Sequence, residues 1–183
     1  METIGIFLSS TIDDLRKERK AIAESINFRQ ECKAVYAESF SASTLSSEQV
    51  CLEAVRRCNI YVGIFKNKYG FVPIKNNPNG FCVTALEYYE AKANGLSILI
   101  FVDEEADGVE DKLSVFLKEI MDFNNGHFIK FYSNLSDLVR FVLEAIDNEI
   151  VQDRFKARMR AMRVEQAQKI YELPYFIRLR ERL

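Results

Sequence analysis

The chain has 183 residues, of which 48% are hydrophobic and 28% are charged, and its formal net charge is −2. This length and composition suit one folded domain with an appendage, and they exclude a disordered chain. No apolar run reaches the roughly 18 residues that a membrane-spanning helix needs. The N-terminal residues enter a strand directly, without the regions of a signal peptide, so we expect a cytoplasmic protein with no membrane contact.

Short apolar runs alternate with amphipathic helical patterns along most of the chain. We expect strands over residues 4–8, 33–39, 60–65, 96–102 and 127–132. We expect helices over residues 11–28, 46–58, 84–94 and 111–123, and from 135 onward. Short strands that are apolar throughout indicate a parallel sheet covered on both faces. The predicted fold class is α/β, a flavodoxin-like three-layer sandwich with a five-stranded parallel sheet in the order 2-1-3-4-5.

The last part of the chain differs from the rest in charge. Residues 1–150 carry 16 basic and 23 acidic side chains, whereas residues 151–183 carry 9 and 4. We therefore expect an α/β domain over 1–150 and a basic helical extension over 151–183. The helix should continue to about Glu172, before a break at Pro174, and lead to a further domain. No recognition motif accompanies this basic helix, so we do not expect it to bind nucleic acid.

The cysteines give little sign of a metal centre. Cys32, Cys51, Cys58 and Cys82 form no CxxC pair, and the chain has a single histidine. A zinc site would need ligands that this set barely supplies. We expect buried free thiols, no metal and no cofactor.

The first strand leads into a run of hydroxyl side chains at the place where a ligand would bind. In an open parallel sheet, ligands bind beyond the carboxyl ends of the strands where the strand order reverses. For the order 2-1-3-4-5, this place lies between the first and third strands. Ser9, Ser10, Thr11 and Asp13 follow the first strand and suit a ribose. The simpler interpretation is that Ser10 or Thr11 caps the following helix.

A long loop follows the third strand and can cover such a ligand. It contains Lys68, Tyr69 and Gly70, and the glycine suits a turn. Tyr69 either stacks on a base or covers the core. No Walker motif, GxGxxG or GxSxG sequence is present.

Thr84 and Glu87 stand three residues apart at the predicted start of a helix. This is the spacing of a capping box, in which each side chain bonds a backbone N–H of the first turn. A glutamate at this edge of an α/β sheet can also take part in chemistry. The sequence leaves both roles open for Glu87.

Several blocks of the sequence together resemble a TIR-like domain of unknown function. They are "IGIFLSSTIDDLRKERKAI", "AESF", "CLEAVRRCNIYVGIFKNKYGF" and "TALEYYEAKANGLSILIFV". Members of that family typically read F-I-S-S-T-x-x-D-L-x-x-E-R, then a block ending in rYG, then S/T-x-x-E-x-x-x-A. The resemblance covers roughly residues 3–103, and it implies an N-terminal domain of a signalling or defence protein.

The same blocks are more distantly similar to TIR domains and nucleoside deoxyribosyltransferases. Those proteins have a flavodoxin-like fold. They use a glutamate on the helix after the third strand to cleave an N-glycosidic bond. The residue of this chain that matches that glutamate is Glu87. The resemblance implies hydrolysis of NAD or a nucleoside, with Ser9, Ser10 or Asp13 on the ribose and Tyr69 facing the base. The alternative is a non-catalytic module that senses a nucleotide-like ligand or associates with itself. Asn59, Lys66 and the lack of tryptophan depart from the usual pattern.

Overall fold

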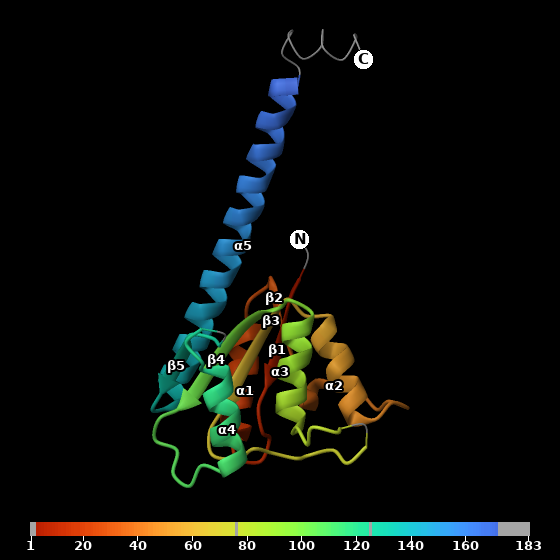
Figure 1. Cartoon of the computed structure of the whole chain (residues 1–183). Helices are drawn as coiled ribbons and strands as arrows, with labels where there is room; N and C mark the ends of the chain where they lie inside the picture. The colour runs from red at the N-terminus through yellow and green to blue at the C-terminus, as the bar shows by residue number, and fades with distance from the viewer. Residues whose placement is uncertain (1–2, 76, 125, 172–183) are drawn as a thin grey trace. The chain divides into compact units, whose positions relative to one another are not determined.

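The structure is a computed structural model that describes residues 3–75, 77–124 and 126–171. The chain divides into two compact units, Met1–Ala145 and Ile146–Leu183. The first unit contains the sheet, and the second contains the later part of the last helix (Figure 1). The domain boundary expected at residue 150 stays a prediction, and Pro174 lies outside the described residues.

The first unit is built on a five-stranded parallel sheet. Its strands are β1 (Ile4–Ser9), β2 (Cys32–Val35), β3 (Ile60–Phe65), β4 (Ser97–Asp103) and β5 (Ile129–Tyr132). They are hydrogen-bonded in the order β2-β1-β3-β4-β5, and every neighbouring pair is parallel. The predicted α/β class and strand order are therefore confirmed.

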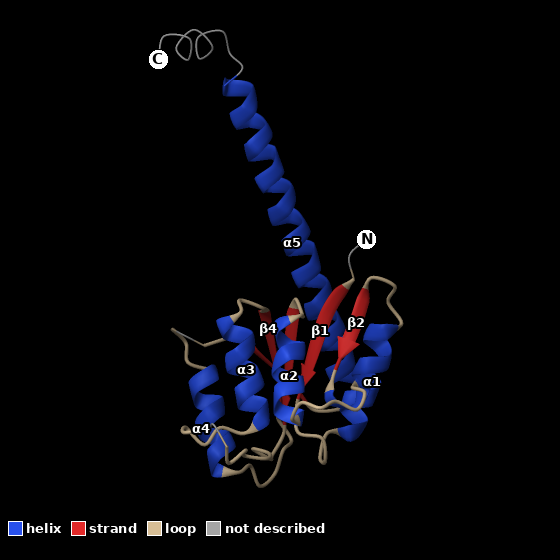
Figure 2. Cartoon of the chain, turned by 90° about the vertical axis from the view of Figure 1, so that its right-hand side faces the viewer, coloured by secondary structure: helices blue, strands red, loops and turns tan. Residues whose placement is uncertain are grey.

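Helices connect the strands. They are α1 (Arg16–Asn27), α2 (Ser47–Arg56), α3 (Val83–Ala93), α4 (Asp111–Ile120) and α5 (Leu135–Tyr171), with a short 3₁₀ helix η1 (Ala37–Ser39) after β2. Figure 2 shows α2 and α3 side by side over one face of the sheet, with α1 on the other face. The predicted long last helix is present.

Side chains alternate across the sheet because successive residues of a strand point to opposite faces. Phe7, Tyr61 and Phe65 belong to a buried cluster that α2, α3 and α4 complete. Ile6 and Leu8, the neighbours of Phe7 in β1, are also buried, so the sheet is covered on both faces. The middle strand, β3, is buried at all six positions. The prediction from the continuous apolar runs, that the sheet is covered on both faces, is therefore confirmed.

The second strand is shorter than predicted. It ends at Val35 rather than at residue 39, and Ala37–Ser39 form η1 instead. The Ser39 hydroxyl donates a hydrogen bond to the carbonyl oxygen of Tyr36 at 2.6 Å. This local bond turns the chain out of the sheet, which is a common effect of serine beside a strand.

A capping box is present at a helix where it was not predicted. At the start of α2, the Gln49 backbone N–H donates to the Ser46 hydroxyl at 3.2 Å, and the Ser46 N–H donates to the Gln49 side-chain oxygen at 3.1 Å. These two bonds satisfy donors of the first turn and set the start of α2.

The cysteines are all buried and free, as expected. Within the described ranges, no helix is both long and apolar enough to cross a membrane. No group of three or more His, Cys, Asp or Glu side chains among the described residues is arranged to hold a metal ion.

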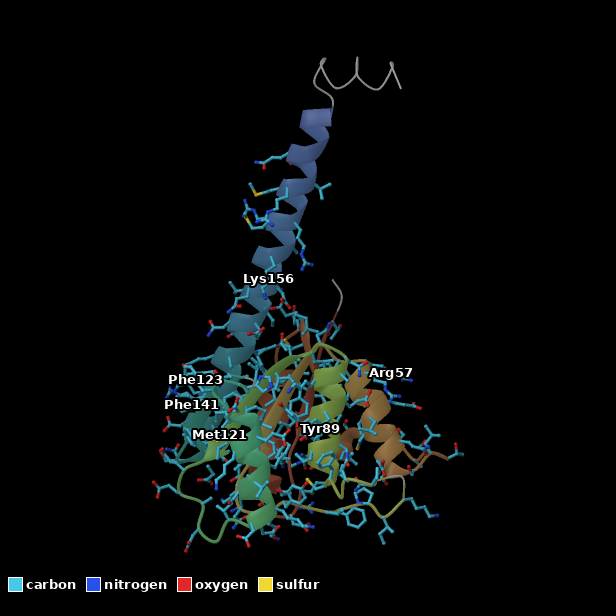
Figure 3. The ribbon with its side chains drawn as sticks, in the orientation of Figure 1. Arg57, Tyr89, Met121, Phe123, Phe141 and Lys156 are labelled. Atoms are coloured by element: carbon cyan, nitrogen blue, oxygen red, sulfur yellow. The ribbon has the colours of Figure 1, made fainter. Side chains whose placement is uncertain are left out.

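The second unit consists of helix over its described length. The helix is described as far as Tyr171, and its expected end at Glu172 lies outside the described residues. Val151, Met162 and Val164 are exposed on it. Lys156, labelled in Figure 3, lies 3.8 Å from Asp153, one turn earlier.

Candidate functional site

A cavity of about 350 Å³ opens at the carboxyl end of β1. Residues from the turn after β1, from α1, α2 and α3, and from the loop after β3 line it. Seven of the residues singled out from the sequence are in this lining: Ser10, Thr11, Asp13, Lys68, Gly70, Thr84 and Glu87. The cavity therefore lies at the switch between the first and third strands, where sheets of this type bind ligands.

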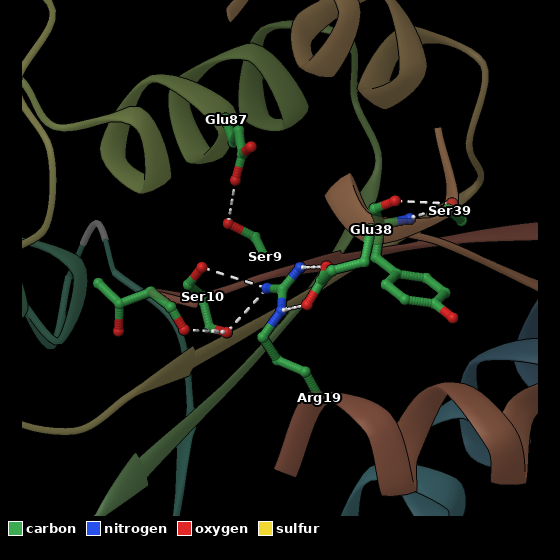
Figure 4. Close-up of polar contacts among 8 residues, drawn as sticks. Ser9, Ser10, Arg19, Glu38, Ser39 and Glu87 are labelled. Carbon is green, nitrogen blue, oxygen red and sulfur yellow. Dashed lines mark hydrogen bonds and ion pairs between the residues drawn. The ribbon is translucent and has the colours of Figure 1, made fainter. Parts of the chain in front are cut away.

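Glu87 is the buried carboxylate of the cavity, with only 6% of its surface exposed. The Ser9 hydroxyl, at the end of β1, donates a hydrogen bond to Glu87 Oε2 at 2.5 Å (Figure 4). Burial raises the pKa of Glu87 to about 7, and the Ser9 hydrogen bond and the Arg19 charge partly oppose this rise. Near neutral pH, Glu87 is therefore present in both its ionised and its protonated form.

The capping-box interpretation of Thr84 and Glu87 is wrong. Helix α3 begins at Val83, and its N-cap is Cys82, whose sulfur accepts a hydrogen bond from the Ala85 N–H at 3.4 Å. Glu87 instead bonds Ser9, which is 78 residues away in the sequence. The early start of the helix turns Thr84 and Glu87 inward, and both are 6% exposed.

Arg19 lies beneath the same cavity and is 2% exposed. Its Nε and Nη2 atoms donate to the two carboxylate oxygens of Glu38 at 2.8 Å and 2.5 Å. Its Nη1 atom donates to the carbonyl oxygen and the hydroxyl of Ser10 at 3.1 Å and 2.9 Å. The paired guanidinium holds the pKa of Glu38 below its usual value.

Sequence reasoning did not single out Arg19 as a site residue, although a signal for it exists. Arg19 lies on the inward stripe of α1, four residues after Leu15 and three before Ile22, and both of these are fully buried. A buried arginine on an apolar stripe requires a partner, because an isolated charge is costly to bury. Glu38 of η1 is that partner.

The Cys51 thiol of α2 is a second neighbour of Glu87 that the sequence did not reveal. It lines the cavity and lies close enough to Glu87 for each group to shift the pKa of the other. Burial raises the pKa of Cys51 to about 12, with a further contribution from the negative charge of Glu87. At neutral pH the thiol is therefore protonated, and its interaction with Glu87 lowers the pKa of the carboxylate.

The loop after β3 forms the outer wall of the cavity. Lys68 and Phe71 are exposed there. Gly70 has a φ of +95°, and a Cβ atom at this position would lie 2.9 Å from Thr11 Cγ2. Only glycine combines this backbone conformation with so close an approach to Thr11.

Tyr69 does not line the cavity. It is 7% exposed, and its ring packs edge-on against Phe116 with the ring centres 6.5 Å apart. Its backbone N–H donates to the Glu110 carboxylate at 2.9 Å. Of the two roles weighed for Tyr69, covering the core is the one that is present.

The expectation that Ser10 or Thr11 caps the first helix is also wrong. Helix α1 begins at Arg16, its N-cap is Leu15, and no side chain caps it. Turn residues separate the end of β1 from this helix, so the Ser10 hydroxyl is free to accept the hydrogen bond from Arg19. Thr11 lines the cavity instead.

Fold and site together define an α/β domain with a buried carboxylate in a cavity at the carboxyl end of its sheet. The sequence profile described as "Domain of unknown function (DUF4062)" matches residues 5–147. The chain belongs to this family.

No curated protein has a sequence that matches this chain significantly. Among solved structures, the chain is similar to "Structure of Clostridium botulinum CMP N-glycosidase, BcmB", with 13% sequence identity and a TM-score of 0.49. That match covers 75% of this chain and 96% of the other.

Proposed function

We propose that this domain hydrolyses the N-glycosidic bond of a nucleoside or of a larger nucleotide such as NAD, with Glu87 as its catalytic carboxylate. The observation that supports this proposal is a buried carboxylate that lines a cavity, accepts a hydrogen bond from Ser9 and has a pKa of about 7. A carboxylate whose pKa is shifted by burial inside a cavity is typical of catalytic sites.

The chemistry requires one carboxylate beside the anomeric carbon. When the bond between C1′ and the base breaks, the electron pair leaves with the base and positive charge builds on the sugar. Ionised Glu87 stabilises that charge or attacks C1′. Water then supplies a hydroxyl group to C1′, and its remaining proton passes to the base or to solvent. The Ser9 hydroxyl holds the carboxylate as a hydrogen-bond donor.

The size and lining of the cavity suit a nucleoside. Its volume of about 350 Å³ lies near the lower end of the range of small-ligand pockets. Ser10, Thr11 and Asp13 offer groups for sugar hydroxyls, and exposed Lys68 offers a positive charge for a phosphate. A dinucleotide such as NAD would place only its reacting half in the cavity.

The test is release of free base, resolved by chromatography after incubation with NAD, NADP, nucleosides and their 5′-monophosphates. Glu87→Gln is the decisive variant, because a glutamine oxygen still accepts the Ser9 hydrogen bond but carries no charge. Glu90→Gln is the matched control on the same helix, since Glu90 pairs with Arg56 and does not line the cavity. We expect release by the wild type and by Glu90→Gln, and a loss of about 100-fold or more with Glu87→Gln.

A wild-type protein that releases no base from any of these compounds, whether dilute or concentrated, would overturn the proposal. Equal release by wild type and Glu87→Gln would show that another group performs the chemistry.

The second candidate is a non-catalytic module that senses a nucleotide-like ligand or associates with itself. The observation that favours self-association is the exposed aromatic surface before and along edge strand β5. Phe123 and Phe128 are 100% and 97% exposed, and Phe123 is labelled with Met121 in Figure 3. An unpaired edge strand beside apolar side chains is a common association surface. Sedimentation of wild type and Phe128→Ser at several concentrations tests it, and a monomer throughout would refute self-association.

A further inference from the structure

We propose that Arg19 is a positioning residue of this site, which holds the chain after β1 so that the Ser9 hydroxyl points at Glu87. The consequence for catalysis rests on the proposed function, whereas the positioning itself is measurable without a substrate.

The contacts of Arg19 connect two parts of the molecule that meet at the cavity. One edge of the guanidinium donates to both carboxylate oxygens of Glu38, next to the cavity-lining residue Ala37. The Nη1 atom donates to both the carbonyl oxygen and the hydroxyl of Ser10. Figure 4 shows the guanidinium between these two partners, with the Ser9–Glu87 bond beside it. Arg19 therefore ties η1 to the first residue after β1.

Ser10 is where the chain leaves the sheet. Ser9 is the last residue of β1 and is paired with Gly63 of β3. The next residue, Ser10, is held by the two hydrogen bonds that Arg19 donates to it. Ser9 is therefore restrained by its pairing in the sheet and by the fixed position of Ser10. Its hydroxyl donates to Glu87 at 2.5 Å. A shift of the chain at Ser10 would move that hydroxyl away from the carboxylate.

The geometry is specific to arginine. A planar guanidinium donates to a carboxylate with two parallel bonds and still has donors on its remaining nitrogen. A lysine ammonium keeps the positive charge, but it has a single nitrogen and cannot reproduce the fork. Because Arg19 is 2% exposed, water does not replace the missing bonds.

The charge of Arg19 acts on Glu87 in the same direction as the Ser9 bond. Burial raises the pKa of Glu87, whereas the Ser9 hydroxyl, the Arg19 charge and the Cys51 thiol lower it. Tyr61 on β3 and Cys82 at the start of α3 also interact with Glu87, and burial raises the pKa of both. Asp13, Glu48 and Lys68 line the same cavity. Tyr61 and Cys82 stay neutral near pH 7, and a substitution at Arg19 leaves the other cavity-lining side chains in the sequence, so a difference in the Glu87 midpoint between variants reports on the contacts of Arg19.

The test compares Arg19→Lys with Arg56→Lys by NMR titration of ¹³C-labelled glutamate carboxyl groups. The Glu87 resonance is assigned as the one that Glu87→Gln lacks. Arg56 also pairs with a glutamate, at 2.6 Å, but it is half exposed and its partner is Glu90. The control therefore loosens an Arg–Glu pair that connects α2 to α3 outside the cavity.

We expect the Glu87 midpoint to rise by about half a pH unit or more in Arg19→Lys, because the positive charge stays while the Ser9 bond loosens. In Arg56→Lys we expect no change. Ser10→Ala removes one of the two Arg19 acceptors and should give a smaller rise. An unchanged midpoint in both Arg19→Lys and Ser10→Ala would overturn the inference, and Ser10→Ala alone decides it if Arg19→Lys does not fold.

Turnover separates this inference from the proposed function. If the wild type releases base, Arg19→Lys should lower kcat by about 10-fold or more with a much smaller change in KM, because the reacting groups are misplaced while the ligand groups remain. If the wild type releases no base and the Glu87 midpoint still rises in Arg19→Lys, the glycosidase proposal fails and the positioning role stands. Unchanged kcat together with an unchanged midpoint refutes the positioning role alone.

Discussion

Two arginine–glutamate pairs in this domain have similar chemistry and very different surroundings. In one, Arg19 Nη2 lies 2.5 Å from Glu38, and the side chains are 2% and 33% exposed. In the other, Arg56 Nε lies 2.6 Å from Glu90, and the arginine is 52% exposed. Water can replace the exposed pair at little cost, but it does not reach the buried guanidinium. Contact distance alone therefore does not distinguish the two pairs, whereas burial and the further bonds from Arg19 to Ser10 do.

The largest expected difference between the pairs is in stability. Arg19→Met should lower the free energy of unfolding by about 3 kcal/mol, because it leaves Ser10 and Glu38 without their donor. Arg56→Met should lower it much less, because water solvates the partners of an exposed pair. Urea denaturation of both variants measures this contrast. Equal losses would show that burial does not distinguish the pairs.

The pH dependence of stability tests the burial of Glu87. Its pKa rises from 4.5 to about 7 on folding, so the folded state holds the proton more tightly than the unfolded state does. The contribution of Glu87 to the free energy of unfolding is therefore greatest below pH 4.5, and it falls as the pH rises towards about 7 and above. The free energy of unfolding of Glu87→Gln, relative to that of the wild type, should increase by roughly 3 kcal/mol between pH 4 and pH 8. Thermal or urea unfolding across this range measures the gain, and parallel curves would contradict a buried, shifted Glu87.

A smaller effect is expected at Gly70, on the outer wall of the cavity. Gly70→Ala forces a side chain into a φ of +95° and against Thr11 at 2.9 Å, and should cost about 1–2 kcal/mol. Gly108→Ala is the matched control, since its φ is +66° and nothing lies within 4 Å of a Cβ there. The difference in unfolding free energy between the variants isolates the contact with Thr11. No difference would mean that the loop moves away freely.

The smallest expected effect is the response of the two pairs to salt. Exposed charges are screened within about 10 Å at 0.1 M salt, whereas buried pairs are screened much less. Double-mutant cycles should show that the Arg56–Glu90 coupling weakens between 0.05 M and 1 M salt. The Arg19–Glu38 coupling should stay nearly constant. If salt weakened the two couplings equally, Arg19 would be in contact with solvent.

The elements of the fold were predictable because their signals are local. Strand β3 was expected over residues 60–65 and has those bounds, since six consecutive buried positions give a continuous apolar run. Strand β2 was overextended by four residues, because the Ser39–Tyr36 hydrogen bond competes with the sheet and no hydrophobic pattern reports it.

The site was only partly predictable. The resemblance to a known family singled out Glu87, and the spacing from Thr84 gave the incorrect alternative of a capping box. The capping box at the start of α2, formed by Ser46 and Gln49, has the same spacing. Spacing alone does not distinguish the two helices, because the outcome depends on which residue begins the helix and which side faces the sheet.

By itself, the sequence determined the alternation of strands and helices, the strand order and the neighbourhood in which a ligand would bind. These follow from hydrophobic periodicity and from the limited ways in which parallel strands connect. Only the tertiary structure decided which polar groups are buried together. Ser9, Arg19, Cys51 and Glu87 come from β1, α1, α2 and α3, and they meet only because packing on the sheet brings these elements to one edge. The shifted pKa of Glu87 arises from that shared burial, which no local pattern contains.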